Sequence, residues 1–447
     1  MLRGMIRISP LVIVLVLLSG CGGSSSGGSS SGGSGGGGGN NGTTVTFTIT
    51  GSPTGVATQI GAGAFTAATL SDNKLTLSLP EGTTNFAVAY VCPPLTMTFA
   101  SPPETQEFDE TVIEASTLDG NSFTGYCNSL SSSSESGTLT GTVDTSAISG
   151  INSLGIYAQN SEAEWGETLS TSNGSFSFYA PAGTDRVLLE AYETTGGSPE
   201  GEKLLAVKNF SSQSVPGALN GGNPVVLGAA DQTTQEPISF QNLPAGVTTP
   251  FTDAYYELNG FESIYDAYGY LTAYQVLPAG AVEGGDSYYF SSTANVSNTQ
   301  ATNGTGEVFV EMTSTSGGPI SFSFPSAWTY AGPKAAAWPS FDVGYTGFSS
   351  TTDVCDHVSM VWTLPYNSQD IVTNEVQVTA SANYLAGSTT VAIPDLTGLT
   401  NFLAAPASQT MVSWGADVYQ GNSPCFQSLG LNESVKGASV GGTYTAP

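Results

Sequence analysis

The chain has 447 residues, and its hydrophobic content of 39% and aromatic content of 10% are high enough to build hydrophobic cores. Thirty-six Asp and Glu residues outweigh eight Lys and Arg residues, which gives a formal net charge of −28. Such a surface repels nucleic-acid phosphates and anionic lipids, so the composition argues against nucleic-acid binding. The length predicts two to four domains.

Residues 1–20 have the pattern of a secretory signal peptide. Arg3 and Arg7 form a short positive head, and an apolar run follows from Leu11 to Leu18. A transmembrane helix needs roughly 20 apolar residues, so this run is too short to cross a bilayer. Removal of the segment would leave six basic residues and a net charge of about −30.

The signal peptide ends in Leu18-Ser19-Gly20-Cys21, which resembles the bacterial lipobox. In that family the cysteine thiol receives a diacylglyceryl group, the chain is cut before the cysteine, and the new amino terminus is acylated. The resemblance implies that Cys21 is lipidated and anchors the protein to a membrane. Gly22 stands where an aspartate would resemble the inner-membrane retention signal, so we expect the outer membrane if the host has one. The alternative is an ordinary signal peptide cut near Gly20.

Residues 21–43, which follow the signal peptide, consist mostly of glycine and serine. This composition predicts a disordered coil with a mean span of roughly 25 Å. We interpret the segment as a tether that separates the folded part from the lipid headgroups. A low-complexity surface coat is the alternative.

Beyond residue 43, apolar and polar residues alternate with a period of two, and no stretch keeps a helical period. Turn-forming residues interrupt the alternation at short intervals, so we predict an all-β fold. The clearest strand patterns are VTFTIT (45–50), GEVFVEM (306–312), PISFSF (319–324), NEVQVTA (374–380) and MVSWGADVY (411–419).

An internal repeat links residues 75–91 with residues 176–192. Each copy has an alternating strand, a Pro-x-Gly-Thr turn that starts at Pro80 or Pro181, and a second apolar strand. The second copy, with its lead-in GTLTGTV at 137–143, resembles the carboxypeptidase regulatory-like, transthyretin-like β-sandwich family. This resemblance covers residues 137–230 and implies a small accessory sandwich on a secreted protein.

The fold expected behind the tether is therefore a row of tandem small β-sandwich domains. We assign the first domain to residues 44–129, the second to 137–230, and a β-rich C-terminal region to 238–447, as one large or two small sandwiches. Residues 129–137 and 228–237 are the predicted linkers.

Apart from Cys21, four cysteines remain, and an even number in an exported chain predicts disulfide bonds. Four cysteines allow three pairings. Proximity and domain order favour Cys92 with Cys127 and Cys355 with Cys425. Neither pair has the spacing of a metal site.

The single histidine, His357, lies close to Asp353, Cys355 and Asp356. A zinc site needs three or four converging nitrogen or sulfur ligands, and a cysteine nucleophile needs a free thiol. Neither condition is expected here, so we interpret the segment as a surface turn ahead of the strand VSMVWTL.

No motif points to catalysis. Gly-x-Ser-x-Gly occurs only inside the tether, and no motif selects a pair of catalytic carboxylates. We therefore predict that the protein is not an enzyme and has no cofactor and no metal site. The calcium candidates weighed against solvated acidic turns are Asp353 with Asp356, and Glu162, Glu164 and Glu167.

The C-terminal region is rich in aromatic residues. We expect its tryptophans, Trp328, Trp338, Trp362 and Trp414, to fill the core. The stretch 256–274 is rich in tyrosine, which tolerates partial exposure, so Tyr265, Tyr268 and Tyr270 are candidates for stacking on a ligand.

The sequence predicts a lipid-anchored envelope protein with a structural or interaction-mediating role, whose partners are the membrane and an envelope protein or glycan. The alternative is a surface lipoprotein that binds carbohydrate or another ligand.

Overall fold

The computed structural model describes residues 42–97, 105–127, 136–160, 164–169, 173–194, 202–258, 261–296, 306–348, 354–365, 371–421, 425–426, 429 and 431–447. Most of these residues lie in strands, as the alternation predicted, and one short segment, α1 (Ala382–Leu385), is an α-helix. Within the described ranges, no helix is long and apolar enough to cross a membrane.

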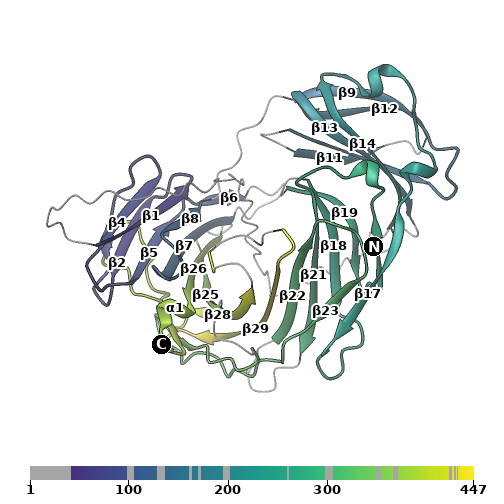
Figure 1. The fold of residues 1–447 in the computed structure, drawn as a ribbon. Helices are drawn as coiled ribbons and strands as arrows, with labels where there is room; N and C mark the ends of the chain where they lie inside the picture. The colour runs from purple at the N-terminus through teal and green to yellow at the C-terminus, as the bar shows by residue number, and fades with distance from the viewer. Residues whose placement is uncertain are drawn as a thin grey trace, which may run out of the picture.

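A 13-stranded sheet curves through the molecule and takes strands from both ends of the chain (Figure 1). Its strands, in spatial order, are β19 (Phe261–Gly269), β18 (Phe251–Leu258), β21 (Ser287–Val296), β22 (Gly306–Ser314), β29 (Ser434–Thr445), β28 (Met411–Gly421), β25 (Val354–Pro365), β26 (Ile371–Ser381), β7 (Thr105–Ser116), β5 (Asn85–Val91), β2 (Gly55–Ile60) and β3 (Thr66–Ala67), with β6 (Leu95–Met97) paired to β7.

The two ends of the chain meet where β26 pairs with β7 in parallel, from Ile371 opposite Thr105 to Ala380 opposite Glu114. The backbone hydrogen bonds therefore continue from the N-terminal part into the C-terminal part. No local pattern in the sequence indicates this pairing, because it joins strands more than 250 residues apart.

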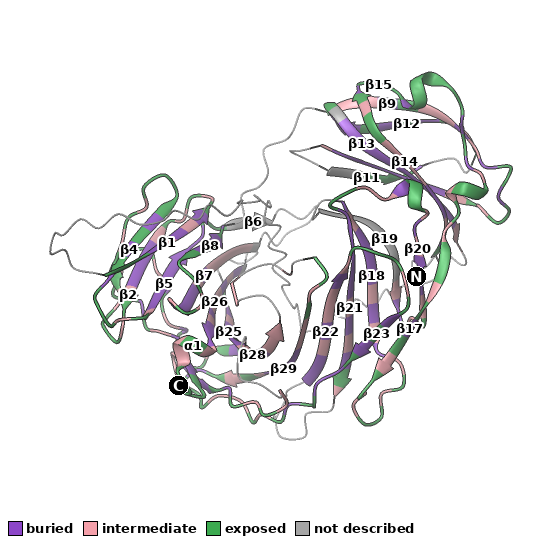
Figure 2. Ribbon diagram, viewed as in Figure 1, coloured by how far each residue is buried: buried purple, intermediate pink, exposed green. Residues whose placement is uncertain are grey.

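The outer face of the curved sheet, which carries Val358, Met360 and Trp362 of β25, packs on the largest hydrophobic cluster. In β25 buried residues alternate with intermediate ones, and Figure 2 shows both classes along the strands of the curved sheet. Trp328, Trp362 and Trp414 lie in this cluster and Trp338 packs against it, so the tryptophans fill the core as predicted.

Small elements cover this outer face. They are β17 (Thr234–Gln241), β20 (Ala273–Val276) and β23 (Ile320–Ser323) in one sheet, β24 (Ser340–Asp342) and β27 (Thr390–Ala392) in another, and the 3-10 turn η4 (Ala279–Ala281). Two other 3-10 turns, η2 (Leu219–Gly222) and η3 (Ala229–Asp231), lie against the sandwich described below. β17 begins at Thr234, inside the predicted linker 228–237, because residues 234–237 pair with β20; residues 238–241, which follow the predicted linker, pair with β23.

At the N-terminal end, a three-stranded sheet covers the opposite, inner face of the curved sheet. Its order is β4 (Lys74–Leu79), β1 (Thr43–Thr50) and β8 (Ser122–Tyr126). The alternation of Val45, Phe47 and Ile49 directs these three side chains into a cluster with Phe86 and Val88 of β5. The period-2 pattern thus encodes a buried face here, as predicted.

Residues 136–226 form two packed sheets with a separate core. One sheet has the order β11 (Glu164–Thr168), β10 (Ser153–Gln159), β13 (Gly183–Thr194) and β14 (Glu202–Val215); the other has β12 (Gly174–Pro181), β9 (Ser136–Asp144) and β15 (Gly217–Ala218), with β16 (Val225–Val226) also paired to β9. Leu139, Phe178, Val187 and Leu189 are fully or almost fully buried between the sheets.

The repeated Pro-x-Gly-Thr turns connect strands that are consecutive in the chain but lie in different sheets, β4 with β5 and β12 with β13. Gly82 between β4 and β5 has φ +79°, and Gly183 at the start of β13 has φ +135°. Glycine adopts positive φ without the steric cost that a Cβ atom brings. The sequence repeat therefore encodes a repeated backbone reversal.

Candidate functional site

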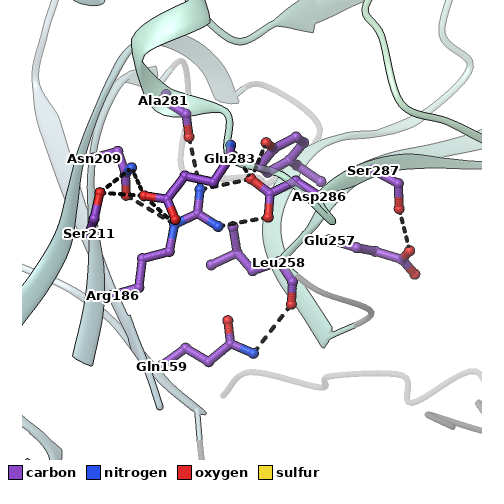
Figure 3. Close-up of polar contacts among 11 residues, drawn as sticks. Gln159, Arg186, Asn209, Ser211, Glu257, Leu258, Ala281, Glu283, Asp286 and Ser287 are labelled. Atoms are coloured by element: carbon purple, nitrogen blue, oxygen red, sulfur yellow. Dashed lines mark hydrogen bonds and ion pairs between the residues drawn. The ribbon is translucent and has the colours of Figure 1, made fainter. Parts of the chain in front are cut away.

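The most strongly bonded polar site lies where the sandwich of residues 136–226 meets the curved sheet (Figure 3). Arg186 is the only arginine after Arg7, and β13 places it at this junction. Its Nη1 lies 2.7 Å from Asp286 Oδ1, and its Nη2 lies 2.8 Å from Asp286 Oδ2. This bidentate geometry is the strong form of an arginine–carboxylate contact.

Arg186 makes two further hydrogen bonds. Its Nη2 donates to the carbonyl of Ala281 at 3.0 Å, and its Nε donates to Asn209 Oδ1 at 3.0 Å. The Asn209 amide donates to Glu283 at 2.6 Å, and the Ser211 hydroxyl donates to the same carboxylate. The guanidinium thus joins β13 and β14 to the segment that follows η4.

Asp286 is completely buried as a side chain, and two further donors hold it. The Tyr256 hydroxyl lies 2.6 Å and the Glu283 backbone nitrogen 2.7 Å from Asp286 Oδ2. Burial and the hydrogen bond to Asp286 raise the pKa of Tyr256, so its hydroxyl stays protonated and donates. The carboxylate is therefore compensated by one cation and two neutral donors.

Burial by itself would lower the pKa of Arg186, since a charged group loses hydration in the protein. The hydrogen bonds and charge of Asp286, together with the charge of Glu283, outweigh that effect and raise the pKa. Arg186 is therefore charged at every physiological pH. The site joins the sandwich to the curved-sheet part through this charge-assisted contact.

Apolar contacts surround this ion pair. Leu188, Leu204 and Val207 of the sandwich belong to the same buried cluster as Leu258 and Leu277 of the curved-sheet part. Gln159 Nε2 also donates to the Leu258 carbonyl at 3.3 Å. The two parts are therefore joined by a buried apolar interface with an ion pair in it.

A second polar feature crosses the inner face of the curved sheet. The register places His357, Asp417, Ser439 and Glu307 opposite one another on β25, β28, β29 and β22. Burial and the charge of Glu307 raise the pKa of Asp417 to about 7. The sequence shows acidic residues at alternate strand positions. Only the register between the strands places them in one row across the sheet.

His357 lies within β25 and is half-buried, which corrects the interpretation of this segment as a surface turn. The strand starts at Val354, so the histidine is held by pairing on both sides, and its Nδ1 lies 3.0 Å from Thr379 Oγ1. Burial lowers the pKa of His357 to about 4, so the ring is neutral at pH 7. Asp353 lies outside the described residues.

Three inner-face carboxylates converge further along the sheet. Each of Glu107, Asp109 and Glu375 offers an oxygen within 4.8 Å of the others. Burial, with the neighbouring carboxylates, raises the pKa of Asp109 to about 6 and that of Glu375 to about 7. Shared protons or a cation would relieve this repulsion. The sequence-based calcium candidates do not include these residues, because β7 and β26 are distant in sequence.

The tyrosine candidates lie at the edge of the curved sheet. Tyr268 and Tyr270 both contact the Phe251 ring, with centroids 6.3 Å and 6.1 Å away. Tyr270 is 76% exposed, whereas Tyr268 is half-buried. The Tyr265 backbone pairs with Tyr255 in β18, and its side chain lies outside the described residues.

Two disulfides are present, Cys92–Cys127 and Cys355–Cys425, which are the pairs that the sequence favoured. The second disulfide fixes the segment after β28 to the first residues of β25.

The predicted lipidation site Cys21 and the tether lie outside the described residues, as do Glu162 and the side chain of Glu164. Glu167 is an exposed residue of β11.

Comparisons with known proteins do not indicate a function for this chain. No family model matches the chain, and no curated protein matches it. A solved structure described as "The Bacillus anthracis TIE protein" is similar over 87% of this chain and 67% of that chain, at 10% sequence identity and a TM-score of 0.14. A TM-score this low carries no argument about fold or function.

Proposed function

We propose that the mature protein is a lipid-anchored, extracytoplasmic β-sandwich protein with a structural or interaction-mediating role at the cell envelope. The observation that carries this proposal is the buried Arg186–Asp286 junction. Because it fixes one sandwich to the curved sheet, the chain presents a rigid assembly instead of independently moving domains. The two disulfides suit an oxidising compartment, and the lipobox and tether would supply the anchor.

The anchor is tested by the mass of the mature amino-terminal peptide from membrane fractions, with wild type beside Cys21→Ala. We expect an acylated peptide that starts at Cys21, and a variant that is released or unprocessed. An unmodified wild-type peptide cut elsewhere would refute lipidation. Protease treatment of intact cells would then show which side of the membrane displays the folded part.

Rigid presentation is tested by small-angle X-ray scattering on the folded chain. We expect a single relative placement of the sandwich and the curved sheet to account for the wild-type profile. Arg186→Met should broaden the distance distribution, because the junction loses its ion pair. A wild-type profile that requires many relative placements would contradict the structural role.

The aromatic group of Phe251, Tyr268 and Tyr270, of which Tyr270 is exposed, favours a second candidate function, carbohydrate binding. Aromatic faces stack on sugar rings, and these three rings gather at the edge of the curved sheet. This combination suits a neutral glycan.

A glycan panel read by tryptophan fluorescence and calorimetry tests this candidate. Tyr270→Ala should abolish binding, whereas Tyr179→Ala should not, although Tyr179 is 64% exposed on β12. A flat response of the wild-type chain across a broad panel would remove the candidate.

A further inference from the structure

A cavity separate from the junction and the aromatic group opens beside β22, β23, β28 and β29. Its volume is about 370 Å³, within the range of roughly 300–1,000 Å³ that is usual for ligand sites. Its lining residues are Val310, Met312, Ser321, Ser323, Gln420, Gly421, Ser434 and Lys436. None of these residues is acidic, which is unusual in a chain with a net charge of −28.

The register explains why a cation and apolar groups share this cavity. Lys436 of β29 is paired with Val310 of β22 on one side and with Gln420 of β28 on the other. Met312 is two residues beyond Val310 on the same face of β22, opposite Ser434. The ammonium therefore lies beside an apolar floor formed by Val310 and Met312.

Lys436 differs from the other buried or half-buried cations. Arg186 pairs with Asp286, and Lys208 pairs with Asp231 at 3.2 Å. Among the residues that the structure describes, no acceptor contacts the half-buried Lys436. In this acidic chain, a cation without a carboxylate partner at a cavity is available to an external anion.

Two serine hydroxyls in the cavity lining, those of Ser321 and Ser323, can act as hydrogen-bond donors. Ser321 Oγ accepts a hydrogen bond from Gln241 Nε2 at 3.2 Å, and Ser323 Oγ accepts one from Asn242 Nδ2 at 3.1 Å. Each hydroxyl keeps its own proton to donate. The two serine hydroxyls and the ammonium can together donate hydrogen bonds to the lone pairs of an anionic oxygen group.

We propose that this cavity binds a small organic monocarboxylate with an apolar body. Lys436 would pair with the carboxylate, the serine hydroxyls would donate to it, and Val310 and Met312 would contact the apolar part. The net negative charge of the chain opposes every anion, so binding is expected in the millimolar range and depends on the local cation. The charge strengthens the hydrogen bonds to the carboxylate, whereas the apolar floor contributes separately by contacting the apolar body.

Ligand-detected NMR on the full chain tests the proposal with hexanoate as the probe. Wild type should bind hexanoate saturably, and Lys436→Met should weaken binding at least tenfold. Lys436→Arg should retain binding, because arginine keeps the positive charge. Lys334→Met is the matched control, since Lys334 is exposed and is not one of the residues that line the cavity; it should stay within twofold of wild type.

Two further probes separate the contribution of the charge from that of the apolar body. Hexanol lacks the charge and inorganic sulfate lacks the apolar body, so both should bind more weakly than hexanoate. Met312→Trp should fill the cavity and block hexanoate while leaving the β-sheet circular dichroism unchanged. Equal losses in Lys436→Met and Lys334→Met, equal binding of hexanol or sulfate, or no saturable binding of hexanoate would each overturn the proposal.

Discussion

Arg186→Met is the sharpest test of the junction. Methionine keeps much of the apolar stem but removes the guanidinium, which leaves the fully buried Asp286 carboxylate with only the Tyr256 hydroxyl and the Glu283 backbone amide as donors. Removing one partner of a buried ion pair costs about 3–5 kcal/mol, because the other charge remains desolvated. We therefore expect the unfolding free energy of the transition that includes the junction to fall by about this amount.

Lys208→Met is the matched control. It also removes one positive charge from an ion pair of the same sandwich, but Lys208 is 34% exposed as a side chain and lies 3.2 Å from Asp231. Exposed pairs of this kind contribute about 0–1 kcal/mol, so the control should lose little.

The assay combines urea unfolding with hydrogen–deuterium exchange, because a chain with several cores need not unfold in one step. Exchange in Arg186→Met should increase in β13, in β14 and in the segment from η4 to Asp286, and should stay unchanged in the β4–β1–β8 sheet. If Arg186→Met and Lys208→Met lose equal stability, or if exchange rises evenly through the chain, the buried pair does not hold the two parts together.

Two further perturbations test the inner face. Because burial raises the pKa of Asp417 from 3.8 to about 7, the folded state prefers its protonated form; this stability is present below about pH 4 and is lost as the pH rises through 7. Asp417→Asn should therefore match wild type near pH 4 in urea unfolding and exceed it by roughly 1 kcal/mol or more at pH 8, and a variant less stable than wild type at pH 8 would contradict the desolvation argument. Gly437→Ala would place a Cβ atom 2.3 Å from Phe309 Cζ and 2.8 Å from the Val418 carbonyl oxygen. This overpacking should lower the melting temperature with a cost of about 1–3 kcal/mol, whereas Gly398→Ala, which meets nothing within 4 Å, should not; equal melting temperatures would show that the sheet has room at Gly437.

Local sequence patterns were sufficient to predict the strands and the residues that single sheets bury. The alternation of Val45, Phe47 and Ile49 specifies a buried face because successive side chains of a strand point to opposite sides. The Pro-x-Gly-Thr repeat specifies reversals at Gly82 and Gly183, since positive φ at these positions suits glycine. These properties depend only on near neighbours, so they can be predicted from the sequence.

Features that join distant segments were decided by the tertiary structure. The parallel pairing of β26 with β7 merges the expected N-terminal and C-terminal parts into one sheet, and it carries Glu375 to Asp109. The burial that keeps His357 neutral likewise depends on its two neighbouring strands. Backbone hydrogen bonding is nearly independent of side-chain type, so a local sequence pattern does not reveal which strand edges meet.

The sequence by itself determined the all-β class, the strong negative charge and the disulfide partners favoured by proximity. Tertiary structure alone decided that the one arginine beyond the signal peptide closes a buried junction with Asp286 and that Lys436 faces a cavity without an acidic partner. The physical reason is that composition and periodicity act over a few residues, whereas an ion pair or a cavity requires a register between strands that the chain brings together only when it folds.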